Sequence, residues 1–363
     1  MNRKNFLRLS GGSLAGAVLL GTTGGGALAQ TGSPLKAEFE SAAERYRVPL
    51  ELLMAMAYVN TLWEMPPPSA TPYREGDLHG RGAYGIMQLV QNPSRDTLEK
   101  AASLTRLSEE KLKNSRAANV RGGAAVLAEM QGEKRPSDLN AWQEAVSEYG
   151  DSDLYAVEVF QTLQEGASET ISTGETLSLP AQEEAEVPAV FTAQGKADYR
   201  RATWRPAYWN GARKCVNSIN YCRASRGAGK IDYIVVHVAE GSYSGTISWF
   251  KDRRAGVSAH YVVGREGQVA QCVRNKDIAY HAGNWWYNQR SIGIEHAGYG
   301  SNRRTWTDSM YRESARLSAY LSRRYGIPVN DTHIVRHRKV VATKCPGRHF
   351  DMDRYLRLVR RFK

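Results

Sequence analysis

The sequence predicts two domains of different class: an all-α domain over residues 33–164 and an α/β domain over residues 196–363, with a central mixed sheet flanked by helices. Apolar residues of the first region recur with helical spacing only, whereas the second region alternates short apolar runs with amphipathic stretches. A chain of 363 residues has room for two or three domains. Between the two, residues 165–195 hold six glutamates and no lysine or arginine, which predicts an acidic, flexible linker.

Helices of the first domain are indicated by apolar residues three to four positions apart. Leu52, Leu53 and Met56 form such a stripe after Pro49, a residue suited to a helix start. Prolines at 66–68 then end the helical run. Helices are therefore expected within residues 36–64, 97–130 and 142–149.

The clearest strand of the second domain ends on a histidine. Residues 233–236 read Tyr-Ile-Val-Val and lead directly into His237, the pattern of a buried strand. The expected strands are residues 232–238, 259–263, 268–272, 292–296 and 331–335. The expected helices are residues 245–251, 308–325 and 350–362.

Charge divides the chain at the same place as the hydrophobic pattern. The net charge is +12, but residues 1–195 hold 17 basic and 25 acidic side chains, whereas residues 196–363 hold 32 and 12. A half this basic favours a polyanionic partner. Nucleic acid, an anionic membrane and an anionic cell wall all qualify on charge alone.

The N-terminus narrows that choice. Arg3, Lys4 and Arg8 form a basic segment, no charge follows over residues 9–30, and residues 27–29 read Ala-Leu-Ala, a cleavage pattern. We expect residues 1–30 to be a secretory signal peptide that resembles a twin-arginine signal, with no stable membrane span. Export to the cell wall or beyond argues against nucleic acid and favours anionic wall polymers, with an attraction that salt weakens.

Two imidazoles and a thiol suggest a metal site in the second domain. His237 ends a strand, and His337 and Cys345 bound a loop-like segment. These ligand types suit Zn²⁺, and three protein ligands leave a fourth tetrahedral position for water, as in a catalytic zinc site. His333 is the strongest rival, because it shares a face with His337 in either a helix or a strand. The other histidines that compete are His260, His281, His296 and His349.

The remaining cysteines have structural explanations. Cys215 and Cys222 lie seven residues apart in a stretch rich in Gly, Asn and Ser, and an exported protein can bridge them. Cys272 follows Val-Ala-Gln and is expected to be a small buried side chain near a strand. Other pairings fit the spacing as well.

Five motifs follow one another along residues 231–355. They are Val235-Val-His237, Ser258-Ala-His-Tyr-Val-Val263, Ala279-Tyr-His-Ala-Gly-Asn284, Ser291-Ile-Gly-Ile-Glu295, and Val335-Arg-His337 with Ala342-Thr-Lys-Cys-Pro-Gly347. In this order they resemble the zinc-dependent N-acetylmuramoyl-L-alanine amidases, which share a fold with peptidoglycan-recognition proteins. The resemblance implies zinc bound by His237, His337 and Cys345. It also implies hydrolysis, by a zinc-activated water, of the amide between N-acetylmuramic acid and L-alanine of the stem peptide.

Further residues acquire roles from this resemblance. Glu295 ends an apolar strand, where an unpaired charge is costly and therefore often functional. In the resembling enzymes this glutamate is the base that takes the proton of the attacking water; the alternative is a salt bridge to an arginine. Thr343 is placed to hydrogen-bond the oxyanion. His281, Asn284 and Trp285 lie in a glycine-containing loop suited to contact with sugar and peptide.

The first domain resembles the lysozyme-like lytic transglycosylases. The matching segments are Tyr46-Arg-Val-Pro-Leu-Glu-Leu-Leu-Met-Ala, Gly82-Ala-Tyr-Gly-Ile-Met-Gln and Asn119-Val-Arg-Gly-Gly-Ala-Ala-Val-Leu. That family carries a Glu-Ser pair where this chain has Asn60 and Thr61. Because glycoside cleavage needs a carboxylic acid, we expect an inactive module that keeps a glycan groove, or a structural remnant. Glu64, one helical turn on, is the alternative acid.

These observations together predict a secreted peptidoglycan hydrolase that binds both the glycan strand and the stem peptide. One alternative is a non-catalytic peptidoglycan-recognition protein of the same fold. Another is a bifunctional enzyme that also cuts glycan strands. Relatives that only recognise peptidoglycan lack the cysteine ligand, so the presence of Cys345 favours catalysis.

Overall fold

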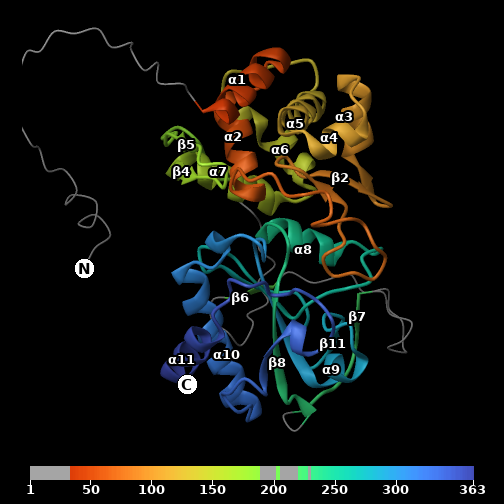
Figure 1. The fold of residues 1–363 in the computed structure, drawn as a ribbon, viewed down its shortest axis with the longest axis vertical. Coiled ribbons are helices and arrows are strands. Elements are labelled where there is room, and N and C mark those ends of the chain that lie inside the picture. The colour runs from red at the N-terminus through yellow and green to blue at the C-terminus, as the bar shows by residue number, and fades with distance from the viewer. Residues whose placement is uncertain (1–32, 189–201, 205–219, 228–229) are drawn as a thin grey trace, which may run out of the picture. The chain divides into compact units, whose positions relative to one another are not determined.

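The structure, a computed structural model, describes residues 33–188, 202–204, 220–227 and 230–363 (Figure 1). The predicted signal peptide, the linker beyond residue 188 and Cys215 lie outside these residues. Ser33–Lys363 make up one compact unit. No helix of the described part is long and apolar enough to cross a membrane.

Helices dominate the first region, as predicted, but short strands accompany them. The helices are α1 (Pro34–Tyr46), α2 (Leu50–Thr61), α3 (Thr97–Thr105), α4 (Glu109–Asn114), α5 (Arg116–Gln131), α6 (Gln143–Gly150) and α7 (Asp153–Glu165). The strands are β1 (Ala83–Tyr84), β2 (Leu89–Asn92) and β3 (Arg95–Asp96), which form one small antiparallel sheet. Serine or aspartate side chains cap the N-termini of four of these helices. Each accepts a hydrogen bond from a backbone N–H of the first turn. These caps are Ser33, Asp96, Ser108 and Ser115.

The prediction of a flexible linker is wrong for residues 165–188, the part of it that the structure describes. Strands β4 (Ala167–Thr170) and β5 (Thr176–Leu179) form an antiparallel hairpin. Leu177 and Leu179 are each 2% exposed and belong to the helical core. Glu175 pairs with Arg116 of α5 at 2.7 Å. The acidic composition concealed a short alternation of polar and apolar residues, and that alternation is sufficient to dock a hairpin.

The second region contains the predicted mixed sheet. Its strands are β6 (Ala202–Trp204), β8 (Tyr233–Val238), β9 (Tyr261–Val263), β10 (Val269–Gln271), β12 (Ser291–His296) and β13 (Ile334–Arg336). They lie in the order β13-β8-β12-β9-β10-β6, and only β9 and β10 run antiparallel to each other. Short strands β7 (Tyr221–Cys222) and β11 (Ile278–Ala279) pair separately.

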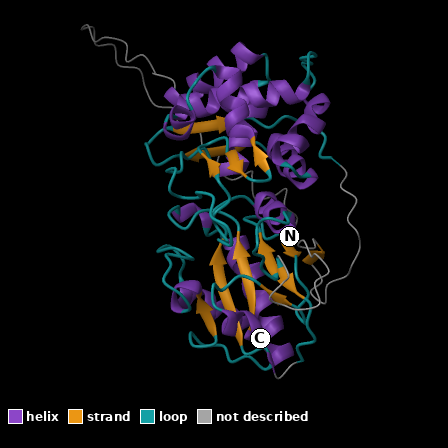
Figure 2. Ribbon diagram, turned by 90° about the vertical axis from the view of Figure 1, so that its right-hand side faces the viewer, coloured by secondary structure: helices purple, strands orange, loops and turns teal. Residues whose placement is uncertain are grey.

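Helices cover both faces of this sheet (Figure 2). Ile234, Val236 and Val238 of β8 share one core with helices α10 (Asp308–Tyr325) and α11 (Met352–Phe362). The opposite face is covered by α8 (Tyr243–Lys251), whose Ile247 packs with Val262 of β9. A further short helix, α9 (Trp285–Arg290), precedes β12. Alternate residues of the central strands therefore face two separate cores.

The helix predicted at 308–325 has those bounds in the structure, whereas α8 begins two residues earlier than expected. Ser242 caps α8 by accepting a hydrogen bond from the backbone of Gly245 at 3.1 Å. Ser244 instead donates its hydroxyl to Glu158 of α7. Cys222 is disulfide-bonded, and Cys272 is buried as predicted, at 1% exposure.

Candidate metal and catalytic site

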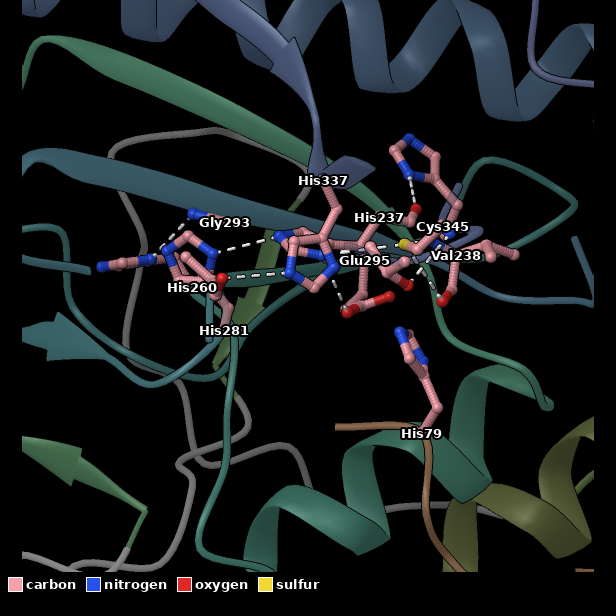
Figure 3. Close-up of polar contacts among 12 residues, drawn as sticks. His79, His237, Val238, His260, His281, Gly293, Glu295, His337 and Cys345 are labelled. Carbon is pink, nitrogen blue, oxygen red and sulfur yellow. Dashed lines mark hydrogen bonds and ion pairs between the residues drawn. The ribbon is translucent and has the colours of Figure 1, made fainter. Parts of the chain in front are cut away.

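Three parallel strands bring the main candidates to one edge of the sheet. His237 of β8 lies opposite Glu295 of the neighbouring strand β12. On the other side of β8, strand β13 ends at Arg336, so that His337 follows at the same edge. The carboxyl ends of parallel strands are the usual place for an active site. Figure 3 shows these side chains converging on one another.

Cys345 reaches this edge from the loop after β13. Its sulfur accepts a hydrogen bond from the backbone N–H of Val238 at 3.3 Å and lies 3.9 Å from Nδ1 of His237. The backbone N–H of Arg338 donates to the carbonyl of Cys345 at 3.0 Å, which closes the loop. The thiol is free and 5% exposed. Burial raises its pKa well above the usual value, an effect that a bound cation would reverse.

A chain of hydrogen bonds fixes the tautomer of His237. The hydroxyl of Ser291 donates to the carbonyl of Tyr287 at 2.6 Å, so its oxygen must accept from Nε2 of His281 at 3.1 Å. Nδ1 of His281 then accepts from Nε2 of His237 at 3.0 Å. Burial and neighbouring imidazoles hold the pKa values of both rings well below the usual value, so both rings are neutral. Nδ1 of His237 is left with a lone pair that faces the sulfur.

Glu295 has the environment of a functional carboxylate. The side chain is fully buried, and neither carboxylate oxygen has a hydrogen-bond partner within the described residues. Oε1 of Glu295 lies 3.8 Å from Nδ1 of His237. Burial raises the pKa of Glu295 well above its usual value, while the charge of Arg81 acts to lower it. The alternative of an arginine salt bridge is not found among the described ion pairs.

The unpartnered atoms fit a bound metal ion. Nδ1 of His337 is also buried without a hydrogen-bond partner, while Nε2 of that ring lies 3.1 Å from the carbonyl of Ala282. Native proteins rarely bury polar atoms unsatisfied, and an ion is one common explanation. Two neutral imidazoles, a thiolate and a nearby carboxylate are a donor set that suits Zn²⁺.

Three of the other candidate histidines have structural partners. His260 accepts a hydrogen bond from the backbone of Gly293 and contacts Arg226 at 2.7 Å through its other nitrogen. His296 bonds the carbonyl of His237 and the hydroxyl of Ser314, both at 2.7 Å. His333 stacks on Tyr233 at the opposite end of β8, since it precedes β13 rather than following it. The strongest rival is thus placed away from the site.

A cleft of about 1700 Å³ adjoins the metal-site candidates, and Thr343 lies on its wall. The hydroxyl of Thr343 accepts a hydrogen bond from the backbone of Cys345 at 3.3 Å. Basic side chains on this wall outnumber acidic ones. They are Arg74, Arg303, Arg304, Arg338, Lys344 and Arg348, against Glu64, Asp77 and Glu240. The cleft therefore favours an anionic ligand.

The three residues predicted to contact substrate divide into two groups. His281 lines the cleft, although it is only 2% exposed, and both of its ring nitrogens are engaged in contacts that position His237. Gly293 provides the space for this ring, because a Cβ there would lie 2.4 Å from it. Asn284 caps α9, and Trp285 is 42% exposed; neither is among the residues that line the cleft.

Sequence reasoning missed one residue of this cluster, His79. The ligand atoms of His79, His337 and Cys345 all lie within 4.8 Å of one another. His237 is outside that trio, although its ring centroid lies 4.4 Å from that of His337. His79 belongs to the loop between α2 and β1, in the region predicted to bind glycan. Neither periodicity nor a local motif singled it out.

Asn60, which stands where the lytic transglycosylases have their catalytic glutamate, is buried. Asn60 is 6% exposed and donates a hydrogen bond to the carbonyl of Met87 at 3.3 Å, while Tyr299 donates its hydroxyl to the carbonyl of Asn60 at 3.4 Å. Glu64, the alternative acid, accepts two hydrogen bonds from Ser172 at 2.8 and 2.6 Å. The amide at position 60 is thus a satisfied structural group.

The region that carries the site is similar in sequence to known proteins. Residues 227–348 match the family described as N-acetylmuramoyl-L-alanine amidase. N-acetylmuramoyl-L-alanine amidase A of Achromobacter lyticus is 38% identical over 131 residues, 36% of this chain and 66% of that protein. The 1,6-anhydro-N-acetylmuramyl-L-alanine amidase AmpD of Haemophilus influenzae is 34% identical over 29% of this chain and 59% of that protein. The chain thus spans about three fifths to two thirds of these relatives.

Solved structures of similar proteins cover the same part of the chain. A mutant endolysin from Bacillus subtilis is 19% identical over 43% of this chain and 96% of its own, with a TM-score of 0.35. A selenomethionine derivative of AmpD is 24% identical over 44% of this chain and 94% of its own, with a TM-score of 0.34. At these scores the likeness adds nothing to the sequence match, which supports an amidase.

Proposed function

We propose that this protein hydrolyses the amide bond between N-acetylmuramic acid and L-alanine of the peptidoglycan stem peptide. The observation that carries the proposal is the fully buried, unpartnered carboxylate of Glu295 beside His237, at the sheet edge where His337 and Cys345 also meet. The match of residues 227–348 to the amidase family supports the same reaction. The names of both similar proteins state this bond type.

In this proposal His237, His337 and Cys345 hold the zinc ion. Zn²⁺, when bound, supplies a Lewis acid that lowers the pKa of water and polarises the scissile carbonyl. His281 and Ser291 hold the imidazole of His237 in the tautomer that presents Nδ1. Without these two hydrogen bonds, His237 could adopt the other tautomer, in which Nδ1 carries a proton and cannot bind a metal ion.

Glu295 is proposed to move the proton during hydrolysis. Its carboxylate takes one proton from the attacking water and passes it to the nitrogen of L-alanine as the amide bond breaks. Burial, which disfavours the charged form of Glu295, makes the carboxylate a stronger base. Thr343, on the cleft wall, is proposed to donate a hydrogen bond to the oxygen of the scissile carbonyl.

The rest of the chain is proposed to serve substrate access. Basic side chains on the cleft wall would receive the carboxylates of the stem peptide or other anionic wall polymers. The first region is proposed to be a lysozyme-like module that does not cut glycan, because the amide of Asn60 cannot act as the general acid. Residues 1–30 are proposed to direct export to the cell wall, for which their composition is the support.

The test is to digest purified peptidoglycan with the wild-type protein and with a Cys345→Ala variant, and to analyse the muropeptides by mass spectrometry. The wild type should release free stem peptides, and chelator should stop the release. The variant should lose zinc and activity together. A Cys272→Ala variant is the matched control, because this buried cysteine does not line the cleft and its loss should leave zinc content unchanged. Stem-peptide release by metal-free protein would rule out the mechanism.

A further inference from the structure

The loop between α2 and β1 brings a histidine to the metal site. His79 has a ligand atom within 4.8 Å of those of His337 and Cys345. Figure 3 shows its imidazole directed toward the group formed by Glu295, His337 and Cys345. Both ring nitrogens are buried and lack a hydrogen-bond partner within the described residues.

Several contacts hold His79 in this position. The carboxylate of Asp77 accepts the backbone N–H of His79 at 3.0 Å, which shapes the turn. Leu78 is 7% exposed and packs in the core beneath α8, with Ile247 and Trp249. Leu78, the neighbour of His79 in the sequence, therefore belongs to a core of the second region.

The end of the loop is held by Arg81. Its guanidinium donates to the carbonyl of Glu240 at 2.6 Å. It also fills the space over Gly241, where a Cβ would lie 1.3 Å from the guanidinium nitrogen. A residue other than glycine at 241 would therefore displace Arg81 from this position.

The unpartnered imidazole needs a physical explanation. Burying a polar group without a hydrogen bond costs free energy, and native proteins generally avoid it. Close to His79 lie a second unpartnered imidazole nitrogen, on His337, and the sulfur of Cys345. No hydrogen bond joins His79 to either group, and two imidazoles and a thiolate are together a donor set that suits one divalent cation.

We propose that His79 is a fourth protein ligand, which closes the zinc site formed by His237, His337 and Cys345. The inference rests on the proposed function above, since it concerns the same ion. Four protein ligands make a closed site, in which no position remains for water. In this conformation the enzyme is therefore latent, and the loop that carries His79 must withdraw before hydrolysis.

Withdrawal of His79 would break the packing of Leu78 and the hydrogen bond of Arg81, whereas the tip of the loop is already open to solvent. Arg74, Glu75 and Gly76 at its tip are exposed, and a Cβ at Gly76 would meet nothing within 4 Å. Residues of this loop and residues 337–349 line the same cleft. A peptidoglycan segment that enters the cleft would therefore meet the loop and the zinc ligands together, which couples substrate arrival to opening of the site.

The experiment compares the full-length wild type with a His79→Ala variant, each loaded with Zn²⁺ or with Co²⁺ as a visible probe. Competition with a chromophoric chelator should show that zinc binds the variant at least tenfold more weakly. Acetohydroxamate should perturb the Co²⁺ spectrum of the variant at a concentration at least tenfold lower than in the wild type, because the variant has an open position. Hydrolysis of a small soluble muramyl peptide should rise in the variant.

Two further variants separate ligation from packing. His79→Cys should restore tight zinc binding and exclude acetohydroxamate, because a thiolate also ligates zinc. His333→Ala removes a histidine outside the site and should behave as wild type. If His79→Ala is poorly folded, His79→Gln replaces it in the same measurements.

The outcomes distinguish this inference from the proposed function. Equal zinc affinity and equal acetohydroxamate response in wild type and His79→Ala would overturn the role of His79 as a ligand. That role is also overturned if the variant loses hydrolysis while its zinc affinity is unchanged, since His79 would then serve the substrate. If the wild type releases no stem peptides from peptidoglycan, the proposed function itself fails, whatever His79 does.

Discussion

Asn60 and Glu295 are buried polar side chains at the ends of two regular elements, and their surroundings are opposite. Asn60, in the last turn of α2, is a neutral amide that donates to the carbonyl of Met87. Glu295, near the end of β12, is a carboxyl group with no hydrogen-bond partner within the described residues. The polar group of the first position is satisfied within the fold, and that of the second is not.

Asn60 therefore stabilises the fold, whereas Glu295 lowers the stability of the protein. An unpartnered buried carboxylate is destabilising, and such costs are typical of catalytic groups. A buried amide with a backbone partner contributes modestly to stability and needs no other explanation. The comparison thus favours chemistry in the second region and packing in the first.

The largest expected effect comes from Glu295→Gln, which keeps the shape of the side chain and removes the base. Amide hydrolysis should fall by about 10²–10⁴-fold, the usual contribution of a general base. Zinc content should stay at the wild-type level, as measured by atomic absorption. If the variant hydrolysed the amide at a rate within tenfold of wild type, Glu295 would not be the base. Its burial would then indicate no more about catalysis than that of Asn60.

A second carboxyl group, that of the partly buried Glu158 of α7, sharpens the comparison because it has hydrogen-bond partners. Ser244 donates both its hydroxyl and its backbone N–H to this carboxylate. Burial raises the pKa of Glu158 to about 7, and these two hydrogen bonds act to lower it. The protonated form is therefore favoured in the folded protein, and its contribution to stability is present below pH 4.5 and lost as pH rises to about 7.

Glu158→Gln should remove this pH dependence. Relative to wild type, the variant should gain on the order of 2 kcal/mol in unfolding free energy above pH 7, less than the full shift implies because the carboxyl keeps some contact with water. Urea unfolding at pH 5 and pH 8 measures the difference. The same wild-type-to-variant difference at both pH values would show that Glu158 does not titrate in this range.

The smallest expected effect belongs to Asn60→Ala. The variant loses one hydrogen bond, while the carbonyl of Met87 still accepts a hydrogen bond from Tyr149 at 2.9 Å. Stability should fall by about 1 kcal/mol in denaturant unfolding, and amide hydrolysis should not change. Analysis of reducing ends and anhydro sugars should detect no glycan cleavage by wild type or variant. If the wild type released glycan products and the variant did not, Asn60 would be a catalytic residue and not a structural one.

Much of the second region could be predicted because its information is local. A run of apolar residues gives strand β8 and the position of His237 at its end, and a capped amphipathic stretch gives α10 with both of its predicted bounds. His337 follows β13 for the same reason. The β4–β5 hairpin was missed because its apolar alternation spans only four residues within an acidic segment.

The sequence by itself determined that His237 and Glu295 each end an apolar strand, because the residue pattern of a strand is a local property. Its five ordered motifs, through the resemblance that they carry, predicted that these residues act together with His337 and Cys345. Only the tertiary structure decided that His281 lies behind His237 and that His79 enters the cluster from another region. Both depend on packing between segments far apart in the chain, through Gly293 in one case and Leu78 in the other, and no local pattern encodes such contacts.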